Sequence, residues 1–261
     1  MASYPAASFI RFYQNHRLLT VDLRPTWRTV DGGSRTYVEQ LMRGFAGRLE
    51  TGHAVVGVER NGSEARVRTA DGGAAGFDHV VLAIHADQAL ALLDAPTPDE
   101  AQLLSTIPFR SNRAVLHRDA RLMPKRRAAW AAWNHLGLSG QAGEGGVTYW
   151  MNRLQNLDPA HPLFVTLNPI REVAADKTIA TIPYEHPLFD SKAVEAQEHL
   201  WRLQGNRNTW FAGSYFGHGF HEDALQAGLA AAEAVGGVRR PWDVAGESSR
   251  ITLSPVLEAA E

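Results

Sequence analysis

The chain has 261 residues, 44% of them hydrophobic, which is enough for one large domain or two small ones with a real core. A formal net charge of −2 gives no electrostatic reason to expect nucleic acid or an anionic membrane as the main partner. The absence of cysteine excludes disulfides and thiolate chemistry, and no apolar run approaches the ~18 residues of a membrane span. We therefore expect a soluble, cytoplasmic protein without a transmembrane segment.

The first third of the chain predicts two helices and then a β-meander. Residues 9–19 have loosely helical spacing, and a second helical pattern begins at Ser34. Residues 55–60, 65–69 and 77–84 predict three strands, joined by an Asn-Gly turn and an Asp-Gly turn. Residues 80–84 of the third strand are apolar without alternation, which predicts burial on both faces.

The rest of the chain predicts a second sheet between two helices, followed by a strand, a turn and a third helix. Thr97 and Glu100 predict a capping box at the start of the first helix. Asp190 or Ser191 is expected to cap a helix that runs to about Gly205. The second sheet is predicted from 113–118, 129–135, 146–152 and 163–168, and the final elements are a strand at 209–212, a glycine-rich turn at 213–219 and a helix at 222–235.

The glycine-rich turn and the helix that follows it have properties that suit a flat cofactor. Glycines let the backbone approach a ring system closely, as at Gly213 and Gly219. The amide groups and the dipole at the start of the helix favour an electron-rich oxygen. An ordinary strand, turn and helix, in which Glu222 and Asp223 complement the helix dipole, explains the same residues equally well.

A second turn, Gly32-Gly33, leads into a helix whose first turn carries Ser34. It again offers backbone amides at the amino end of a helix. By itself this segment is better explained as an ordinary helix start with Ser34 as the N-cap.

These two segments, with Phe77 to Ala83 between them, resemble the superfamily of flavin-binding amine oxidases and phytoene desaturases. More narrowly, the chain resembles a bacterial group of predicted NAD/FAD-binding proteins or amine oxidoreductases. The resemblance implies an FAD cofactor that takes a hydride from a carbon next to an amine or from a saturated carbon chain. Segments typical of the group are Asn15-His16, 27–38, 85–93, Leu116-His117, Met123-Pro124, 130–134, 149–155, 167–169, His186-Pro187 and 219–223.

The chain departs from this superfamily in one respect. No G-x-G-x-x-G turn follows a strand, although that turn normally holds the pyrophosphate of the cofactor. Gly217 and Gly219 have the first spacing, but Glu222 occupies the third glycine position. We therefore expect the chain to begin inside the substrate region, and to bind FAD weakly or not at all unless a complementing chain supplies the missing unit. A non-catalytic scaffold derived from a flavoprotein is the alternative.

The resemblance implies an α/β fold in which a partial, Rossmann-like FAD domain with a β-meander carries an inserted mixed-sheet substrate domain. Residues 1–29 are expected to be a remnant of the substrate region. The FAD-domain remnant is assigned to 30–95 and 205–237, the substrate domain to 96–204, and a loosely packed tail to 238–261.

The substrate is expected to be a small molecule, and the aromatic middle segment favours an apolar or lipid-like one. Tyr149 and Trp150 should point to opposite faces of their strand, so at most one of them lines a cavity. His218 and His221 are three residues apart, but no H-E-x-x-H or cysteine supports a metal site, and no G-x-S-x-G supports a serine hydrolase. No catalytic residue is assigned. The predicted cofactor contacts are Gly32, Gly33, Ser34, Val58, Ala83, Gly213, Ser214, Gly219, Phe220, His221, Glu222, Asp223 and Gly228.

Overall fold

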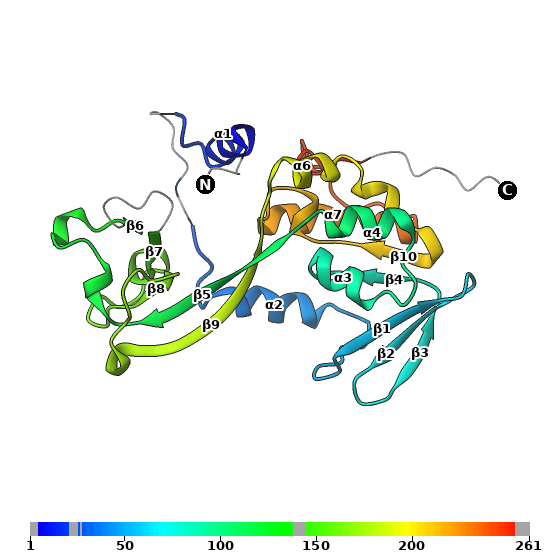
Figure 1. The fold of residues 1–261 in the computed structure, drawn as a ribbon, viewed down its shortest axis with the longest axis horizontal. Helices are drawn as coiled ribbons and strands as arrows, with labels where there is room; N and C mark the ends of the chain where they lie inside the picture. The colour runs from blue at the N-terminus through cyan, green and yellow to red at the C-terminus, as the bar shows by residue number, and fades with distance from the viewer. Residues whose placement is uncertain (1–4, 21–25, 27, 138–144, 254–261) are drawn as a thin grey trace. The chain divides into compact units, whose positions relative to one another are not determined.

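A computed structural model describes residues 5–20, 26, 28–137 and 145–253 (Figure 1). The chain forms two compact units, which we treat separately. The first unit consists of residues 20–48 and 110–186, and the second of residues 2–19, 49–109 and 187–261. These boundaries differ from the expected ones in two ways. Segments 96–109 and 187–204, expected in the substrate domain, belong to the second unit, and residues 30–48, expected in the FAD-domain remnant, belong to the first.

The second unit contains the predicted β-meander, made of β1 (Val55–Arg60), β2 (Ala65–Thr69) and β3 (Ala74–Phe77). Both turns are confirmed: β1 pairs antiparallel with β2, and β2 with β3. Gly62 and Gly72 have φ angles of 95° and 88°, which L side chains rarely adopt. The expected third strand, 77–84, is wrong as one element, because the chain leaves the meander after Phe77 and begins a new strand at Val80.

That new strand, β4 (Val80–Leu82), lies parallel to β10 (Thr209–Phe211), with Thr209 beside Val80 and Phe211 beside Leu82. The expectation that these two segments lie together is confirmed. Burial of β4 on both faces is wrong, because Val81 is 45% exposed. The pair forms a sheet of only two strands among the described residues, so one side of β4 lacks a neighbouring strand.

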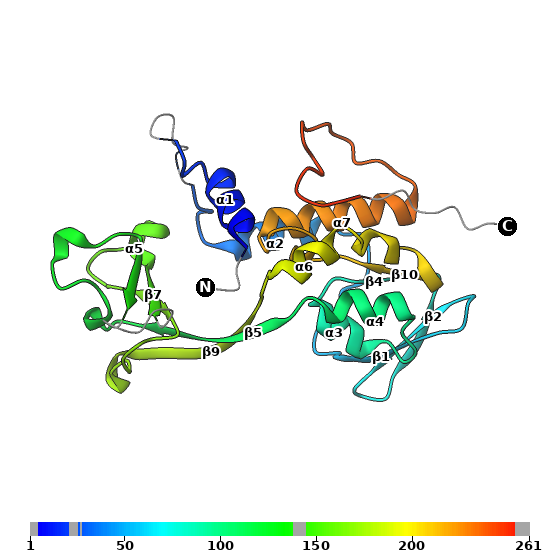
Figure 2. The same cartoon turned by 45° about the horizontal axis from the view of Figure 1, so that its top comes forward.

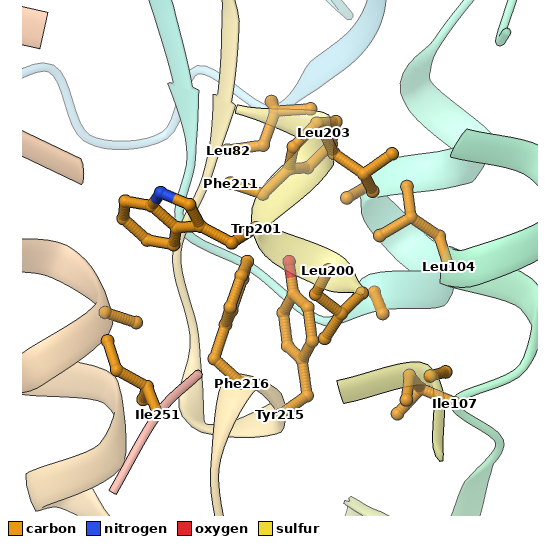
Figure 3. Close-up of a cluster of buried hydrophobic side chains, with 14 of the residues drawn as sticks. Leu82, Leu104, Ile107, Leu200, Trp201, Leu203, Phe211, Tyr215, Phe216 and Ile251 are labelled. Carbon is orange, nitrogen blue, oxygen red and sulfur yellow. The ribbon is translucent and has the colours of Figure 1, made fainter. Parts of the chain in front are cut away.

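Helices cover this parallel pair and close the core of the second unit. Its centre is formed by aromatic and aliphatic side chains, with Tyr215, Phe216 and Trp201 packed beside Leu200 and Phe211 (Figure 3). The helices of this unit are α1 (Ala6–Asn15), α3 (Ala86–Leu92), α4 (Pro98–Ser105), α6 (Ser191–Gln197) and α7 (His221–Gly236).

Two predicted helix starts are confirmed at atomic level. Thr97 and Glu100 form the full capping box of α4, and Asp190 accepts a hydrogen bond from the Ala193 amide at the start of α6. The predicted end of α6 near Gly205 is wrong. The helix ends at Gln197 and a separate 3-10 turn follows, after which the side chain of Gln204 bonds to the backbone of Phe211.

The tail beyond α7, expected to be loosely packed, is anchored at Arg239, Arg240 and Ile251, and several side chains between these anchors are exposed. Arg240 pairs with Glu233, and Arg239 bridges Glu233 and Glu247. Ile251 reaches the core of the unit, so the tail folds back along α7 (Figure 2). Residues 254–261 lie outside the described part of the chain.

The first unit is built on a five-stranded sheet in the order β6-β7-β8-β5-β9. The pairs β5–β8, β6–β7 and β7–β8 are antiparallel. The sequence did not predict β9, and segment 129–135 becomes a strand only from Trp133, after a 3-10 turn at Arg127–Ala129. The strands are β5 (Phe109–His117), β6 (Trp133–Gly137), β7 (Gly145–Trp150), β8 (Phe164–Leu167) and β9 (Thr178–Pro187), and the helices are α2 (Ser34–Arg43) and α5 (Met151–Leu154).

No described helix of either unit is long and apolar enough to cross a membrane.

A buried polar chain crosses one face of this sheet. The Asp119 amide donates to Nδ1 of His117 at 3.0 Å, so the ring proton is on Nε2, which lies 2.7 Å from Oγ1 of Thr166. Thr166 is in turn 2.8 Å from Oγ1 of Thr148. The sheet therefore holds His117 as one neutral tautomer.

We expect this histidine to make the first unit less stable in mild acid. Burial lowers the pKa of His117, and the charge of Asp119 opposes that effect only in part. The native state therefore binds fewer protons than the unfolded state, whose pKa is about 6.5, and stability is lost as the pH falls below that value. Urea midpoints measured from pH 8 to pH 5 should fall more steeply for the wild type than for His117→Gln. Equal slopes would contradict this assignment.

Candidate functional site

The carboxyl ends of β4 and β10 lie side by side in the second unit and form the centre of the candidate site. The amide of Ala212 donates to the carbonyl of Leu82 at 3.1 Å, and α3 and α7 begin soon after the two strands. Ligands of open parallel sheets bind at this edge, where helix starts present free backbone amides.

The glycine turn between β10 and α7 is closely packed. A Cβ on Gly213 would lie 2.6 Å from the ring of Tyr215, and one on Gly217 would lie 2.7 Å from both the Arg250 carbonyl and the Asp223 carboxylate. Gly219 has a φ angle of 87°. The turn therefore needs glycine at these three positions because of the protein's own neighbouring atoms and the backbone angle at Gly219. The close approach of a flat cofactor to Gly213 and Gly219 stays a prediction.

Asp223 organises the first turn of α7. Its carboxylate is fully buried, accepts the Phe220 amide at 2.7 Å and pairs with Nε of Arg250 at 2.6 Å. The Gln226 side chain also accepts the Arg250 amide. Asp223 is therefore occupied within the protein, and it shapes the turn instead of offering its carboxylate to a ligand.

The rings of Phe12, on α1, and His16, just beyond it, lie against Phe220 at the start of α7. The ring centroid of Phe220 is 5.9 Å from that of Phe12 and 5.1 Å from that of His16. The guanidinium of Arg250 lies 5.9 Å from the same ring. Burial lowers the pKa of the neighbouring His218. These groups give the site an aromatic wall with a fixed positive charge.

The predicted cofactor residues are distributed unevenly. Gly213, Ser214, Gly219 and Phe220 come together at the turn, and the side chains of His221 and Glu222 are exposed beside them. Gly32, Gly33 and Ser34 belong to the first unit, where Gly33 and not Ser34 is the N-cap of α2, so their role at a cofactor stays a prediction.

Three further predicted residues lie outside this group, and their contacts with a cofactor stay predictions. Val58 is fully buried in the core, and its carbonyl accepts the Asp94 amide. Ala83 is exposed just beyond β4. A Cβ on Gly228 would meet nothing within 4 Å among the described residues, so this position is not closely packed.

Phe12, His16 and Arg250 were not predicted as site residues. They approach Phe220 from segments far away in the sequence, and Arg250 and Asp223 are 27 residues apart. The Asn15-His16 motif was noticed only as typical of a family. No local pattern in the sequence points to Arg250.

The start of α7 offers free backbone amides, whereas the described part of the chain has no loop that would hold the pyrophosphate of an FAD molecule. The amides of His221 and Glu222 take part in none of the described hydrogen bonds, so they remain available for an electron-rich oxygen beside Gly213 and Gly219. No described turn provides a glycine-rich loop for a pyrophosphate, since the chain passes from β4 through Ile84 and His85 directly into α3. Those residues also contain no cluster of three potential metal ligands.

The parallel strand-helix pair, the meander and the separate sheet together have the fold of FAD-dependent oxidoreductases. In agreement, the sequence profile described as flavin containing amine oxidoreductase matches residues 6–142, which is more than half of the chain, and the chain belongs to that family. Comparison with curated proteins gives no match.

Solved structures support the fold at low sequence identity. A protein from Exiguobacterium sp. 255-15 with a provisional assignment as a protoporphyrinogen oxidase is 13% identical, with a TM-score of 0.58 over 88% of this chain and 58% of its own. Putrescine oxidase bound to putrescine is 12% identical, with a TM-score of 0.55 over 79% and 53%. Reduced UDP-galactopyranose mutase is 8% identical, with a TM-score of 0.50 over 74% and 49%. The chain thus spans about half the length of these structures.

Proposed function

We propose that the chain is the carboxy-terminal part of a longer FAD-dependent oxidoreductase, which oxidises an amine or an apolar, lipid-like substrate. One observation carries the proposal. The turn at Gly213 leads into the first turn of α7 at the carboxyl ends of β4 and β10, and the chain belongs to the flavin containing amine oxidoreductase family. When bound, the flavin would supply the two-electron oxidation.

The chain's own residues would position the flavin ring and shape its electrostatics. The turn at Gly213 and Gly219 lets backbone approach the ring, and the amides of His221 and Glu222 would stabilise negative charge on its oxygen atoms. Phe220 with its α1 neighbours would exclude water from one side. Arg250, held by Asp223, adds a positive charge next to Phe220.

The substrate classes come from two independent observations. Similarity to putrescine oxidase supports an amine. An apolar substrate is supported by the first unit, where the ring centroids of Trp133 and Tyr149 lie 5.7 Å apart on one face of the sheet and Trp133 is half exposed. Trp150 packs instead against Trp130, as the alternation along β7 predicted.

A second candidate is a non-catalytic scaffold or partner subunit derived from a flavoprotein. The specific observation in its favour is that the described residues offer no loop for the pyrophosphate, whose contacts contribute much of the affinity for FAD. A complementing chain that carries a G-x-G-x-x-G unit would turn this scaffold into the proposed enzyme.

The visible spectrum of the purified chain, mixed with FAD and passed through a desalting column, separates these proposals. We expect a colourless protein, because the remaining ring contacts do not offset the entropy of ordering an incomplete site. A yellow protein with one tightly held flavin per chain would show that the missing loop is not needed. A colourless chain that aggregates favours an incomplete enzyme, and a colourless chain that stays dispersed and stable favours the scaffold.

The oxidase proposal is tested on a protein that joins this chain to a glycine-rich nucleotide-binding segment. Anaerobic mixing with diamines and, separately, with fatty acids should bleach the oxidised flavin spectrum for one substrate class only. A joined, folded protein that binds no FAD would refute the proposal that the protein is an FAD-dependent oxidoreductase.

A further inference from the structure

The glycine turn between β10 and α7 is bonded by a side chain that reaches it from another helix. Gln197, the last residue of α6, donates from its side-chain amide to the Tyr215 carbonyl at 2.9 Å and also to the Gly217 carbonyl. Because carbonyl oxygens only accept hydrogen bonds, the group that faces them is the NH₂ of this amide and not its oxygen. One side chain thus fixes the direction of two peptide groups in the turn.

The packing of α6 gives Gln197 a defined place beside the turn. Ala193 and Ala196, on the same helix, are buried in the core of the second unit. The segment that leads into α6 also contacts the turn, since a Cβ on Gly219 would lie 2.9 Å from the ring of Phe189. Gln197 therefore approaches the turn from a layer of the core and not from a loose surface segment.

The direction of the Gly217 carbonyl decides where the next amide points. All described peptide bonds are trans, and the C=O and N–H groups of a trans peptide point in opposite directions. Since the Gly217 carbonyl points to Gln197, the His218 N–H points away from α6. None of the described hydrogen bonds uses this N–H group, so it is available to a ligand.

We propose that Gln197 is a positioning residue of the candidate site, which orients the peptide between Gly217 and His218. It thereby presents the His218 amide as a further free donor of this turn, in addition to the amides of His221 and Glu222. Without Gln197 this peptide group can rotate and place its carbonyl where the amide was, which would repel an electron-rich oxygen. Only the identity of that oxygen, on a flavin ring, rests on the proposed function.

Residual dipolar couplings measured by NMR on the purified chain test the orientation directly, because they report the direction of each N–H bond. The amides of α7 serve as the internal reference. In the wild type the His218 coupling should agree with the structure, and in Gln197→Met, which keeps the volume but not the donors, it should average toward zero. Gln88→Met is the matched control, because Gln88 is exposed on α3 and its side chain makes none of the described hydrogen bonds. A wild-type coupling for His218 in Gln197→Met overturns the proposal.

Gln197→Glu gives a second measurement that decides the question even if Gln197→Met misfolds. The ionised carboxylate has no donor for the two carbonyls and is repelled by them, so the His218 coupling should be lost at neutral pH. The protonated carboxyl group has one donor, and the coupling should recover in part as the pH falls. A His218 coupling that stays at the wild-type value at every pH contradicts the role of Gln197.

The consequence for a cofactor is tested on the protein joined to a nucleotide-binding segment. A free amide near an oxygen of the ring stabilises negative charge, so Gln197→Met should lower the midpoint potential of the bound flavin relative to Gln88→Met. Equal potentials, in a variant whose His218 amide has turned, would overturn the link between Gln197 and the cofactor. A joined protein that binds no flavin refutes the proposed function instead, while the dipolar couplings still decide whether Gln197 orients the turn.

Discussion

Arg60→Ala should destabilise the second unit by about 3–5 kcal/mol, because it leaves a buried carboxylate without its partner. The Arg60 and Glu100 side chains are 1% and 0% exposed and form a bidentate pair with N–O distances of 2.5 and 2.9 Å. Arg60 also donates to the Ala95 carbonyl, and Glu100 closes the capping box of α4 on Thr97. The pair therefore ties the meander to the helical layer.

Urea unfolding followed by circular dichroism measures this effect, with Arg66→Ala as the control. Arg66 lies on the neighbouring strand β2 but is exposed, so its removal should change stability by less than about 0.5 kcal/mol. The double variant Arg60→Met with Glu100→Leu should recover much of the loss, since apolar side chains of similar volume remove both buried charges together. If Arg60→Ala costs no more than Arg66→Ala, this pair does not hold the unit together.

Parts of the fold that depend on neighbouring residues could be predicted from the sequence. The turns at Gly62 and Gly72, the capping box of Thr97 and the Asp190 cap each need a specific residue within three or four positions, and all four are confirmed. The parallel contact of β4 with β10 was also expected, although from a family resemblance and not from a local signal.

Features that arise from distant segments could not be predicted. The apolar run at 80–84 indicates burial, but whether a strand is buried depends on its neighbours in the sheet, and Val81 has a neighbouring strand on one side only. The tail looked loosely packed because its polar residues give no hint of their partners. Its arginines find those partners on α7, and Ile251 reaches the core.

The candidate site also combines features that a local pattern predicts with contacts between distant segments that the sequence does not reveal. Gly213 and Gly219 were identifiable because a glycine-rich turn before a helix is a local pattern with a physical meaning. The pairing of Asp223 with Arg250 could not be predicted, since nothing near Asp223 in the sequence shows that its carboxylate is occupied. The family resemblance implied a cofactor contact for Asp223, and its hydrogen bonds to the Phe220 amide and to Arg250 make it a positioning residue of the turn.

Asp223→Ala should therefore cost about 3–5 kcal/mol of stability and disorder the start of α7. The change removes the acceptor of the Phe220 amide and leaves the guanidinium of Arg250, which is only 20% exposed, without its partner. Asp87→Ala is the matched control, because Asp87 also lies in the first turn of a helix but is exposed. It should lose no more than about 1 kcal/mol of helix-dipole and capping energy.

The Asp223 variant also has a local consequence that a general loss of stability would not produce. The glycine turn is fixed by the contacts of Asp223 with Arg250 and the Phe220 amide, so amide exchange in residues 213–223 should accelerate even in mild conditions where the unit stays folded. Arg250→Ala should accelerate exchange in the same segment, because it opens the same turn from the other side. If exchange there matches that of Asp87→Ala, Asp223 does not position the turn.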